Sequence, residues 1–163
     1  MSVCSVAPSK HIDDLQRLAV EDPDPLVRAM AVESLGFAGE GVVETLGAAR
    51  ADDEGSVREA AATAYGELAD REAVDWLLDR ALNDGDRLVR EAAVAALGAI
   101  GDERAVPTLL ELVVDGPPRV RRRAVVALTV FDDPAIEPAL RQAATDRNPG
   151  VREAAEMVVG RGA

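Results

Sequence analysis

The sequence predicts an all-α fold in which short helix pairs stack in a row. Three observations support this prediction. One sequence unit recurs five times, apolar residues follow helical spacing without the alternation of a strand, and apolar residues make up 48% of the chain although aromatics make up only 2%. A fixed period of roughly 20 to 50 residues is typical of a stacked repeat array. A core of Ala, Val and Leu suits helices that pack closely.

A Val-Arg pair marks each copy of the unit. The arginines are separated by 30, 32, 31 and 31 residues and are Arg28, Arg58, Arg90, Arg121 and Arg152. An aspartate lies six residues before each arginine, at Asp22, Asp52, Asp84, Asp115 and Asp146. An alanine lies three residues after each, at Ala31, Ala61, Ala93, Ala124 and Ala155. We call the helix that carries Val-Arg the first helix of a pair, and the helix that follows it the second helix.

The chain is expected to have a flexible N-terminal tail, residues 1–8, followed by one repeat domain, residues 9–163. It begins on a second helix, because Ile12, Leu15 and Leu18 have helical spacing. First helices are expected at about 25–35, 57–65, 89–97, 118–128 and 151–158. The remaining second helices are expected at about 42–49, 71–82, 106–113 and 136–143, which gives about ten helices in five pairs.

Local signals mark where these helices begin and end. Asp22-Pro23-Asp24-Pro25 and Asp146-Arg147-Asn148-Pro149 suit helix starts, because Asp caps free N–H groups and proline fits a first turn. Gly39-Glu40-Gly41 is expected to be a turn. A glycine eight residues after the arginine is expected to end the first helix in a left-handed conformation, at Gly36, Gly66, Gly98 and Gly160. The fourth unit has Thr129 there, which should reshape that turn.

The paired aspartates and arginines predict a structural ion-pair ladder, made of Asp22, Arg28, Asp52, Arg58, Asp84, Arg90, Asp115, Arg121, Asp146 and Arg152. Each arginine is one turn into its helix and can reach the aspartate of its own or the adjacent unit. The alternative is an anion-binding stripe. The ladder is favoured, because an aspartate accompanies every arginine and cancels its charge.

These motifs identify a family. The run Asp84-x-x-x-x-Val-Arg-x-x-Ala93, then Ala96-Leu97-Gly98, then Gly101-Asp-Glu-Arg-Ala-Val-Pro107, resembles HEAT repeats, most closely the short kind of phycobilisome (PBS) lyase-like proteins. The resemblance covers about residues 9–160. It implies an armadillo-type, right-handed α-α superhelix with first helices on the convex side. The second helices would line the concave side, where partners of this family dock.

Composition excludes several functions. The formal net charge of -12 argues against nucleic-acid and membrane partners, which need a basic surface. His11 and Cys4 are the only residues of their types, so we expect no metal site, no cofactor and no catalytic set, and hence no enzyme. The start lacks a signal peptide and no apolar run could span a membrane, which predicts a cytoplasmic protein. The basic residues are 17 Arg and Lys10, a bias that fits a halophile or GC-rich coding equally.

A partner is expected on the concave second-helix face. Candidate residues there are Asp13, Arg17, Glu44, Asp75, Trp76, Asp79, Arg80, Thr108, Glu111, Glu137 and Arg141. Most are acidic, so the partner should have basic and apolar features. Trp76 would be exposed and act as an anchor. The alternative is that its ring lies flat over Arg80 and merely covers the stack.

Arg119, Arg121, Arg122 and Arg123 form the only basic cluster in the sequence. Arg121 belongs to the ladder. Arg122 and Arg123 point elsewhere on the same helix and suit an acidic segment or an identical chain, but a solvated face paired with nearby acids is the favoured interpretation.

The sequence favours a non-enzymatic scaffold that binds a protein or peptide. The first alternative is a bilin lyase-like or small-molecule-binding protein, although few aromatic residues are available to wall a chromophore pocket. The second is a structural subunit of a larger assembly. Neither end of the array has a polar cap, so the chain could self-associate through its ends.

Overall fold

A computed structural model describes residues 8–38 and 42–160, and in this part of the chain every regular element is a helix. The first helices are α2 (Pro25–Ala38), α4 (Gly55–Glu67), α6 (Arg87–Ile100), α8 (Pro118–Leu128) and α10 (Pro149–Val159). The second helices are α1 (Pro8–Glu21), α3 (Val43–Ala49), α5 (Val74–Asn83), α7 (Val106–Asp115) and α9 (Ile136–Ala143). Single 3-10 turns, η1 (Arg71–Ala73) and η2 (Glu103–Ala105), lead into α5 and α7.

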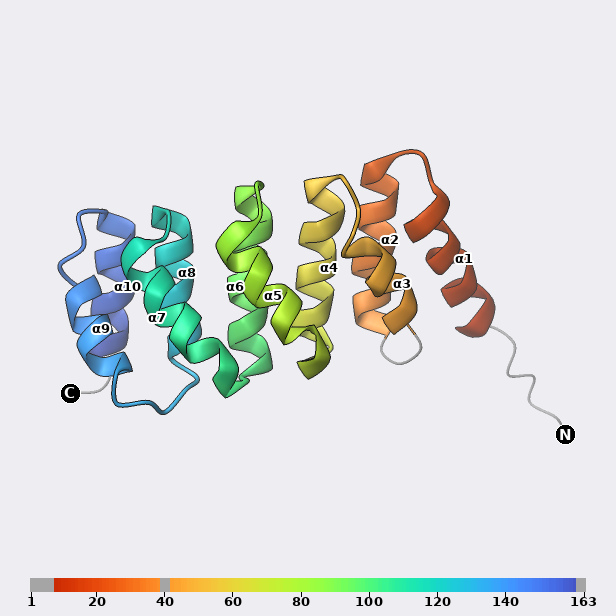
Figure 1. Ribbon diagram of the computed structural model, residues 1–163. Helices are drawn as coiled ribbons and strands as arrows, with labels where there is room; N and C mark the ends of the chain where they lie inside the picture. The colour runs from red at the N-terminus through yellow and green to blue at the C-terminus, as the bar shows by residue number, and fades with distance from the viewer. Residues whose placement is uncertain (1–7, 39–41, 161–163) are drawn as a thin grey trace, which may run out of the picture.

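The helices form two layers that run the length of the molecule. In Figure 1 the second helices lie in front of the first helices, and the N- and C-termini lie at opposite ends of the row. Each first helix packs mainly on the first helices before and after it and on its neighbouring second helices. The prediction of a stacked all-α array of helix pairs is confirmed. Pro8 already belongs to α1, and the rest of the predicted tail, residues 1–7, lies outside the described residues, as does the predicted turn at Gly39–Gly41.

The core lies between the two layers and is built from small and medium apolar side chains. The alanine three residues after each ladder arginine is buried in all five units. Leu35, Leu77, Leu97 and Leu128 are fully buried as well. Tyr65 is the largest fully buried side chain. In the described part of the chain no helix is long and apolar enough to cross a membrane.

Three of the glycines predicted to end first helices instead lie inside them. A side-chain carbon added to Gly36 would be 2.9 Å from the Cβ of Ala64. The same construction at Gly98 gives 2.9 Å to the Cα and Cβ of Ala127. The prediction of left-handed helix ends at these positions is therefore wrong. These glycines let successive first helices approach closely, and Gly101, with φ of 65°, provides the left-handed end of α6.

The two layers differ in how closely their helices are spaced. The Gly36–Ala64 contact recurs at Gly66 with Ala96 and at Gly98 with Ala127. Successive second helices touch one another far less. The concave second-helix face stays a prediction, and the two sides of the array are called below the first-helix face and the second-helix face.

Candidate functional site

Ion pairs join the loops that precede successive first helices. Each pair links a guanidinium to the aspartate of the next unit, with distances of 2.9 Å for Arg28 Nε to Asp52 Oδ2, 2.9 Å for Arg58 Nη2 to Asp84 Oδ1 and 2.8 Å for Arg121 Nη2 to Asp146 Oδ1. The same three guanidiniums donate to backbone carbonyls of their own units, those of Asp22, Asp52 and Gly116. Each of these arginines therefore fixes its own loop to the next one.

The ladder is interrupted at its third step. Arg90 donates to the carbonyl of Ala81 and, among the described residues, has no carboxylate within ion-pair distance. The prediction that Arg90 pairs with the aspartate of its own unit, Asp84, or of the adjacent unit, Asp115, is therefore wrong. Elsewhere the ladder aspartate accepts from the backbone N–H two residues later, as Asp84 does from Asp86 at 2.9 Å. Asp115 cannot do so because Pro117 stands at that position and has no N–H.

The ladder lowers the pKa values of its carboxyl groups. Hydrogen bonds from Arg28 and from Arg121 are the largest influence on Asp52 and Asp146, and hold the pKa of each below its usual value. For Asp84, burial raises the pKa, but the hydrogen bonds from Arg58 and the Asp86 backbone outweigh it and the net shift is downward. The charged pairs are therefore part of the folded state at neutral pH.

A second cluster of ion pairs, which sequence reasoning missed, lies where α5 and α7 begin. Arg104 contacts Asp102 and Asp75, each at 3.0 Å, and Arg71 contacts Asp102 at 3.1 Å. The hydrogen bonds from Arg104 are the largest cause of the low pKa of Asp102, about 2. A sequence signal was present, since Asp70, Asp102 and Asp133 recur with nearly the same period as the ladder.

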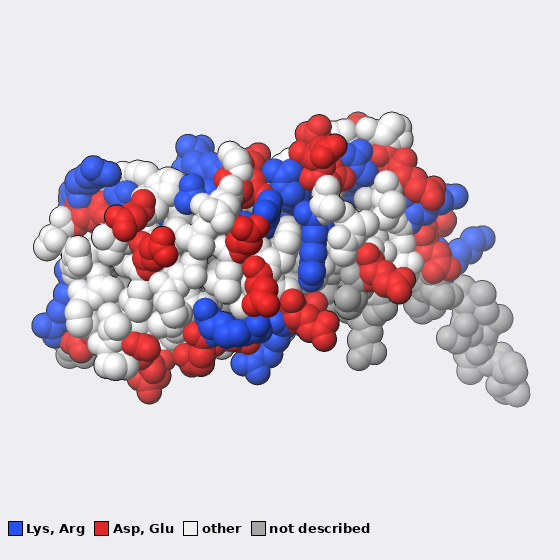
Figure 2. All heavy atoms as spheres, in the orientation of Figure 1, with Lys and Arg blue, Asp and Glu red and all other residues white. Residues whose placement is uncertain are grey.

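The predicted partner-binding residues are spread along the second-helix face. Eight of them are exposed: Asp13, Arg17, Glu44, Asp75, Asp79, Glu111, Glu137 and Arg141. Trp76, Arg80 and Thr108 are half-buried. Figure 2 shows this face with acidic side chains scattered along it and a largely uncharged area over α7 and α9. The predicted residues therefore form a long strip and are not gathered at one point.

Trp76 packs into the array. The guanidinium carbon of Arg50 lies 4.3 Å from the ring centre of Tyr65 and 5.8 Å from that of Trp76, and the two rings are 5.8 Å apart. The prediction of an exposed Trp76 is therefore wrong, and the cation it contacts is Arg50 instead of Arg80. Arg80 is engaged by Asp79 and Asp84. Arg50 lies outside the repeated motif, so no sequence pattern indicated this cluster.

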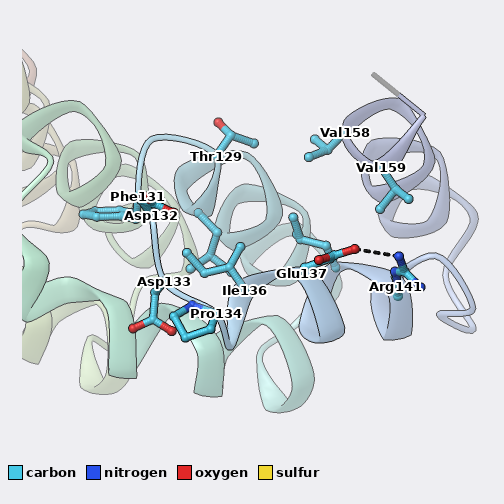
Figure 3. Close-up of a pocket in the computed structure, with 12 residues that line it drawn as sticks. Thr129, Phe131, Asp132, Asp133, Pro134, Ile136, Glu137, Arg141, Val158 and Val159 are labelled. Carbon is cyan, nitrogen blue, oxygen red and sulfur yellow. Dashed lines mark hydrogen bonds and ion pairs between the residues drawn. The ribbon is translucent and has the colours of Figure 1, made fainter. Parts of the chain in front are cut away.

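A groove with a volume of ≈ 760 Å³ lies at the C-terminal end of the second-helix face. Its apolar lining consists of Leu128, Phe131, Pro134, Ile136, Leu140, Val158 and Val159. Asp132, Asp133, Glu137 and Arg141 contribute its charged groups. Figure 3 shows Thr129 at the end of α8 and Val158 on α10 on opposite sides of the opening, with Glu137 paired to Arg141 at 2.5 Å. We call this site the C-terminal groove.

A local change in the repeat explains why a groove opens here. At three earlier junctions a glycine eight residues after the arginine faces an alanine of the next first helix. At the last junction the corresponding residues are Thr129 and Val158. Both line the C-terminal groove and also a second groove of ≈ 330 Å³ on the first-helix face. Larger side chains at a helix crossing hold the axes apart, so this pair leaves space on both sides of the junction. As predicted, Thr129 also reshapes its turn, because α8 ends at Leu128.

Comparisons with known proteins agree with this architecture. A family model described as HEAT repeats matches residues 43–129 and 112–161. The solved complex of CpcE and CpcF of phycocyanin lyase from Nostoc sp. has a chain that is 24% identical, with a TM-score of 0.75, covering 91% of this chain and 98% of that one. Human deoxyhypusine hydroxylase in complex with glycerol is 21% identical, with a TM-score of 0.64, covering 93% of this chain and 62% of that one. A search of curated proteins finds no match.

One prediction needs correction at this point. We expected no enzyme, because the sequence has one His and one Cys and no recognisable catalytic set. The similar solved structures are a phycocyanin lyase complex and a deoxyhypusine hydroxylase, both enzymes by name. The prediction is therefore wrong as an exclusion. At these identities the likeness concerns the fold, and this fold is shared with proteins that have enzymatic activities.

Proposed function

We propose, because the chain belongs to the HEAT-repeat family, that it binds a partner protein or peptide on its second-helix face. Stacked helical repeats present long continuous surfaces that suit extended partners. The observation that supports this proposal most strongly is the C-terminal groove, where an apolar lining meets a charged rim in ≈ 760 Å³. Two predicted site residues, Glu137 and Arg141, contribute to that rim.

The lining defines what kind of segment would fit. Leu140 and Ile136 form the base with Val158 and Val159, and all four are buried or half-buried, so the groove offers apolar contact without a large exposed patch. Such a groove is suited to apolar side chains projecting from one face of a bound helix or extended peptide. A bound apolar side chain would cover surface that the junction of α8 and α10 leaves open.

The rim defines the charge of the partner. The rim has three acidic side chains, Asp132, Asp133 and Glu137, and one basic side chain, Arg141, which is already paired with Glu137. The groove therefore carries a net negative charge. A segment with lysine or arginine beside its apolar residues is attracted to it, and an acidic segment is repelled. This agrees with the expectation of a partner with basic and apolar features.

The test is a titration with a fluorescein-labelled helical peptide that carries leucine on one face and lysine on the other. We expect binding to the full chain to weaken roughly tenfold or more in the variant Asp132→Lys/Glu137→Lys, because two rim charges are reversed. The matched control Glu33→Lys/Glu67→Lys makes the same change in net charge at exposed positions of first helices and should bind like the wild type.

The apolar part of the groove is tested separately. Thr129→Gly/Val158→Ala restores the small pair found at the other junctions and leaves every rim charge in place. This variant should bind the peptide more weakly while its helical circular dichroism is retained. Equal affinity for the wild type and both groove variants would show that the peptide does not use this groove. Light scattering of the wild-type chain alone would test the separate prediction of self-association through its ends.

A further inference from the structure

We propose that the outward face of α8 is a second docking surface, specific for an acidic peptide segment that carries apolar side chains. The surface is formed by Arg119, Arg122, Arg123 and Val126 of α8, Val130 in the turn that follows α8, and Met157 of α10. We call it the α8 face. It lies on the first-helix side of the molecule, whereas the site proposed above lies on the second-helix side, and none of the six residues that define the α8 face lines the C-terminal groove.

Two arginines of the α8 face lack the partners that the sequence led us to expect. Within residues 8–38 and 42–160, Arg122 and Arg123 form no ion pair and no side-chain hydrogen bond, although both are exposed. Arg119 is 3.9 Å from Glu91 Oε2, at the limit of an ion pair, and 65% of its side chain is exposed. The favoured interpretation of a solvated face paired with nearby acids therefore holds for Arg119, which pairs with Glu91, whereas Arg122 and Arg123 are solvent-exposed without such a pair. In a chain of net charge -12, this leaves two guanidiniums without a paired carboxylate.

Apolar side chains stand beside these cations. Val126, Val130 and Met157 are 52%, 59% and 55% exposed. Arg122 and Val126 are four residues apart on α8, as are Arg119 and Arg123, so cationic and apolar groups lie one turn apart on the helix, and Val130 follows in the next turn of the chain. An apolar strip next to unpaired charges is typical of a binding surface.

Three shallow grooves meet along the α8 face, and Val126 lines all of them. One, of ≈ 350 Å³, is lined by Glu91 with all three arginines. Another, of ≈ 230 Å³, lies toward α6 and includes Arg123 and Val130. The third is the ≈ 330 Å³ groove between α8 and α10, which includes Arg122, Glu153 and Met157. Two carboxylates therefore face three guanidiniums, and the surface retains a positive charge.

Charge complementarity determines the occupant. A segment with glutamate or aspartate on one side can pair with Arg122 and Arg123, which form no ion pair within the described part of the chain. Its apolar side chains can lie along Val126, Val130 and Met157. Nucleic acid would also meet the arginines, but most of the molecule is acidic and would repel its backbone, and aliphatic side chains provide no platform on which bases stack.

The experiment measures fluorescence anisotropy of a labelled helical peptide with leucine on one face and glutamate on the other. We expect the full chain to bind it, and Arg122→Glu/Arg123→Glu to weaken binding roughly tenfold or more. Lys10→Glu/Arg147→Glu, at exposed positions outside the α8 face, makes the same change in net charge and should leave the affinity unchanged. Val126→Ser should weaken binding with little dependence on salt.

Several results would overturn the proposal. One is equal binding by the wild type and Arg122→Glu/Arg123→Glu. Another is tighter binding of a single-stranded oligonucleotide than of the acidic peptide, which would assign the arginines to nucleic acid. A third is concentration-dependent dimerisation of the wild type that Arg122→Glu/Arg123→Glu abolishes, with no peptide binding, which would make the surface a contact between copies of this chain.

Discussion

The interrupted ladder predicts that chemically identical substitutions at equivalent positions will have unequal effects. Arg121 and Arg90 occupy the same place in successive units, one residue after the valine of the Val-Arg pair. Arg121 is 2% exposed and is bound by Asp146 and by the carbonyl of Gly116. Arg90 is half-buried and has only the carbonyl of Ala81. Methionine keeps much of the length of either side chain and removes its charge, so Arg121→Met and Arg90→Met compare the two environments directly.

The magnitudes follow from what each substitution leaves behind. Arg121→Met strands the carboxylate of Asp146, and breaking a buried pair by removing one partner costs about 3–5 kcal/mol of unfolding free energy. Arg90→Met strands no carboxylate and loses one charge-assisted hydrogen bond, which costs about 1.5–3 kcal/mol at most because the site is partly open to water. For a chain of this length, each kcal/mol lowers Tm by about 2–4 °C. Arg121→Met should therefore lower Tm by roughly 6–20 °C, clearly more than Arg90→Met.

Urea unfolding followed by circular dichroism at 222 nm measures both costs, with Tm as a second readout. Because repeat arrays can unfold in parts, amide hydrogen exchange should also show that the loss of protection is largest in α8 and α10 for Arg121→Met. Equal costs for the two substitutions would show that the Asp146 pair adds nothing to the ladder, and the account of the interruption at Pro117 would fail.

Two further predictions concern pH and helix spacing. The folded-state pKa of Asp102, about 2, lies below its unfolded value, so its contribution to stability is complete above about pH 4 and is lost as the pH falls toward 2. Asp102→Asn should flatten this part of the stability–pH curve, whereas the exposed control Asp53→Asn should not. Parallel curves for the two variants would contradict the assignment. Gly98→Ala should destabilise the chain by about 1–3 kcal/mol because the added carbon meets Ala127. Gly47 has open space around it, so Gly47→Ala should stabilise α3 by roughly 0.5–1 kcal/mol. Denaturation midpoints that move in the same direction for both variants would refute the spacing argument.

Much of the fold was predictable because it repeats. The Val-Arg period and the spacing of apolar residues located every helix in the described part of the chain, and the aspartates located the ladder loops. The prediction that the repeated glycines end the first helices was wrong, because a glycine that permits close helix contact cannot be told in the sequence from one that ends a helix. Gly36 and Gly98 continue their helices, while the true left-handed end is at Gly101.

The site was less predictable because it arises where the repeat changes. Thr129 was visible as a departure from the glycine pattern, but its partner Val158 belongs to another unit and becomes its neighbour only through stacking. Trp76 was recognisable as unusual, yet its contact with Arg50 joins a second helix to the turn after α3, which no local pattern encodes. The missing Arg90–Asp115 pair could have been anticipated from Pro117, since proline cannot donate the backbone hydrogen bond that orients the aspartate.

The spacing of α8 and α10 tests most directly the claim that Thr129 and Val158 open the C-terminal groove. A crystal structure of Thr129→Gly/Val158→Ala should show the axes of the two helices closer by about 1–2 Å, as expected when small residues replace large ones at a crossing. The C-terminal groove and the groove on the opposite face should shrink together. An unchanged axis separation, or a groove that keeps its full volume in the double variant, would contradict the account.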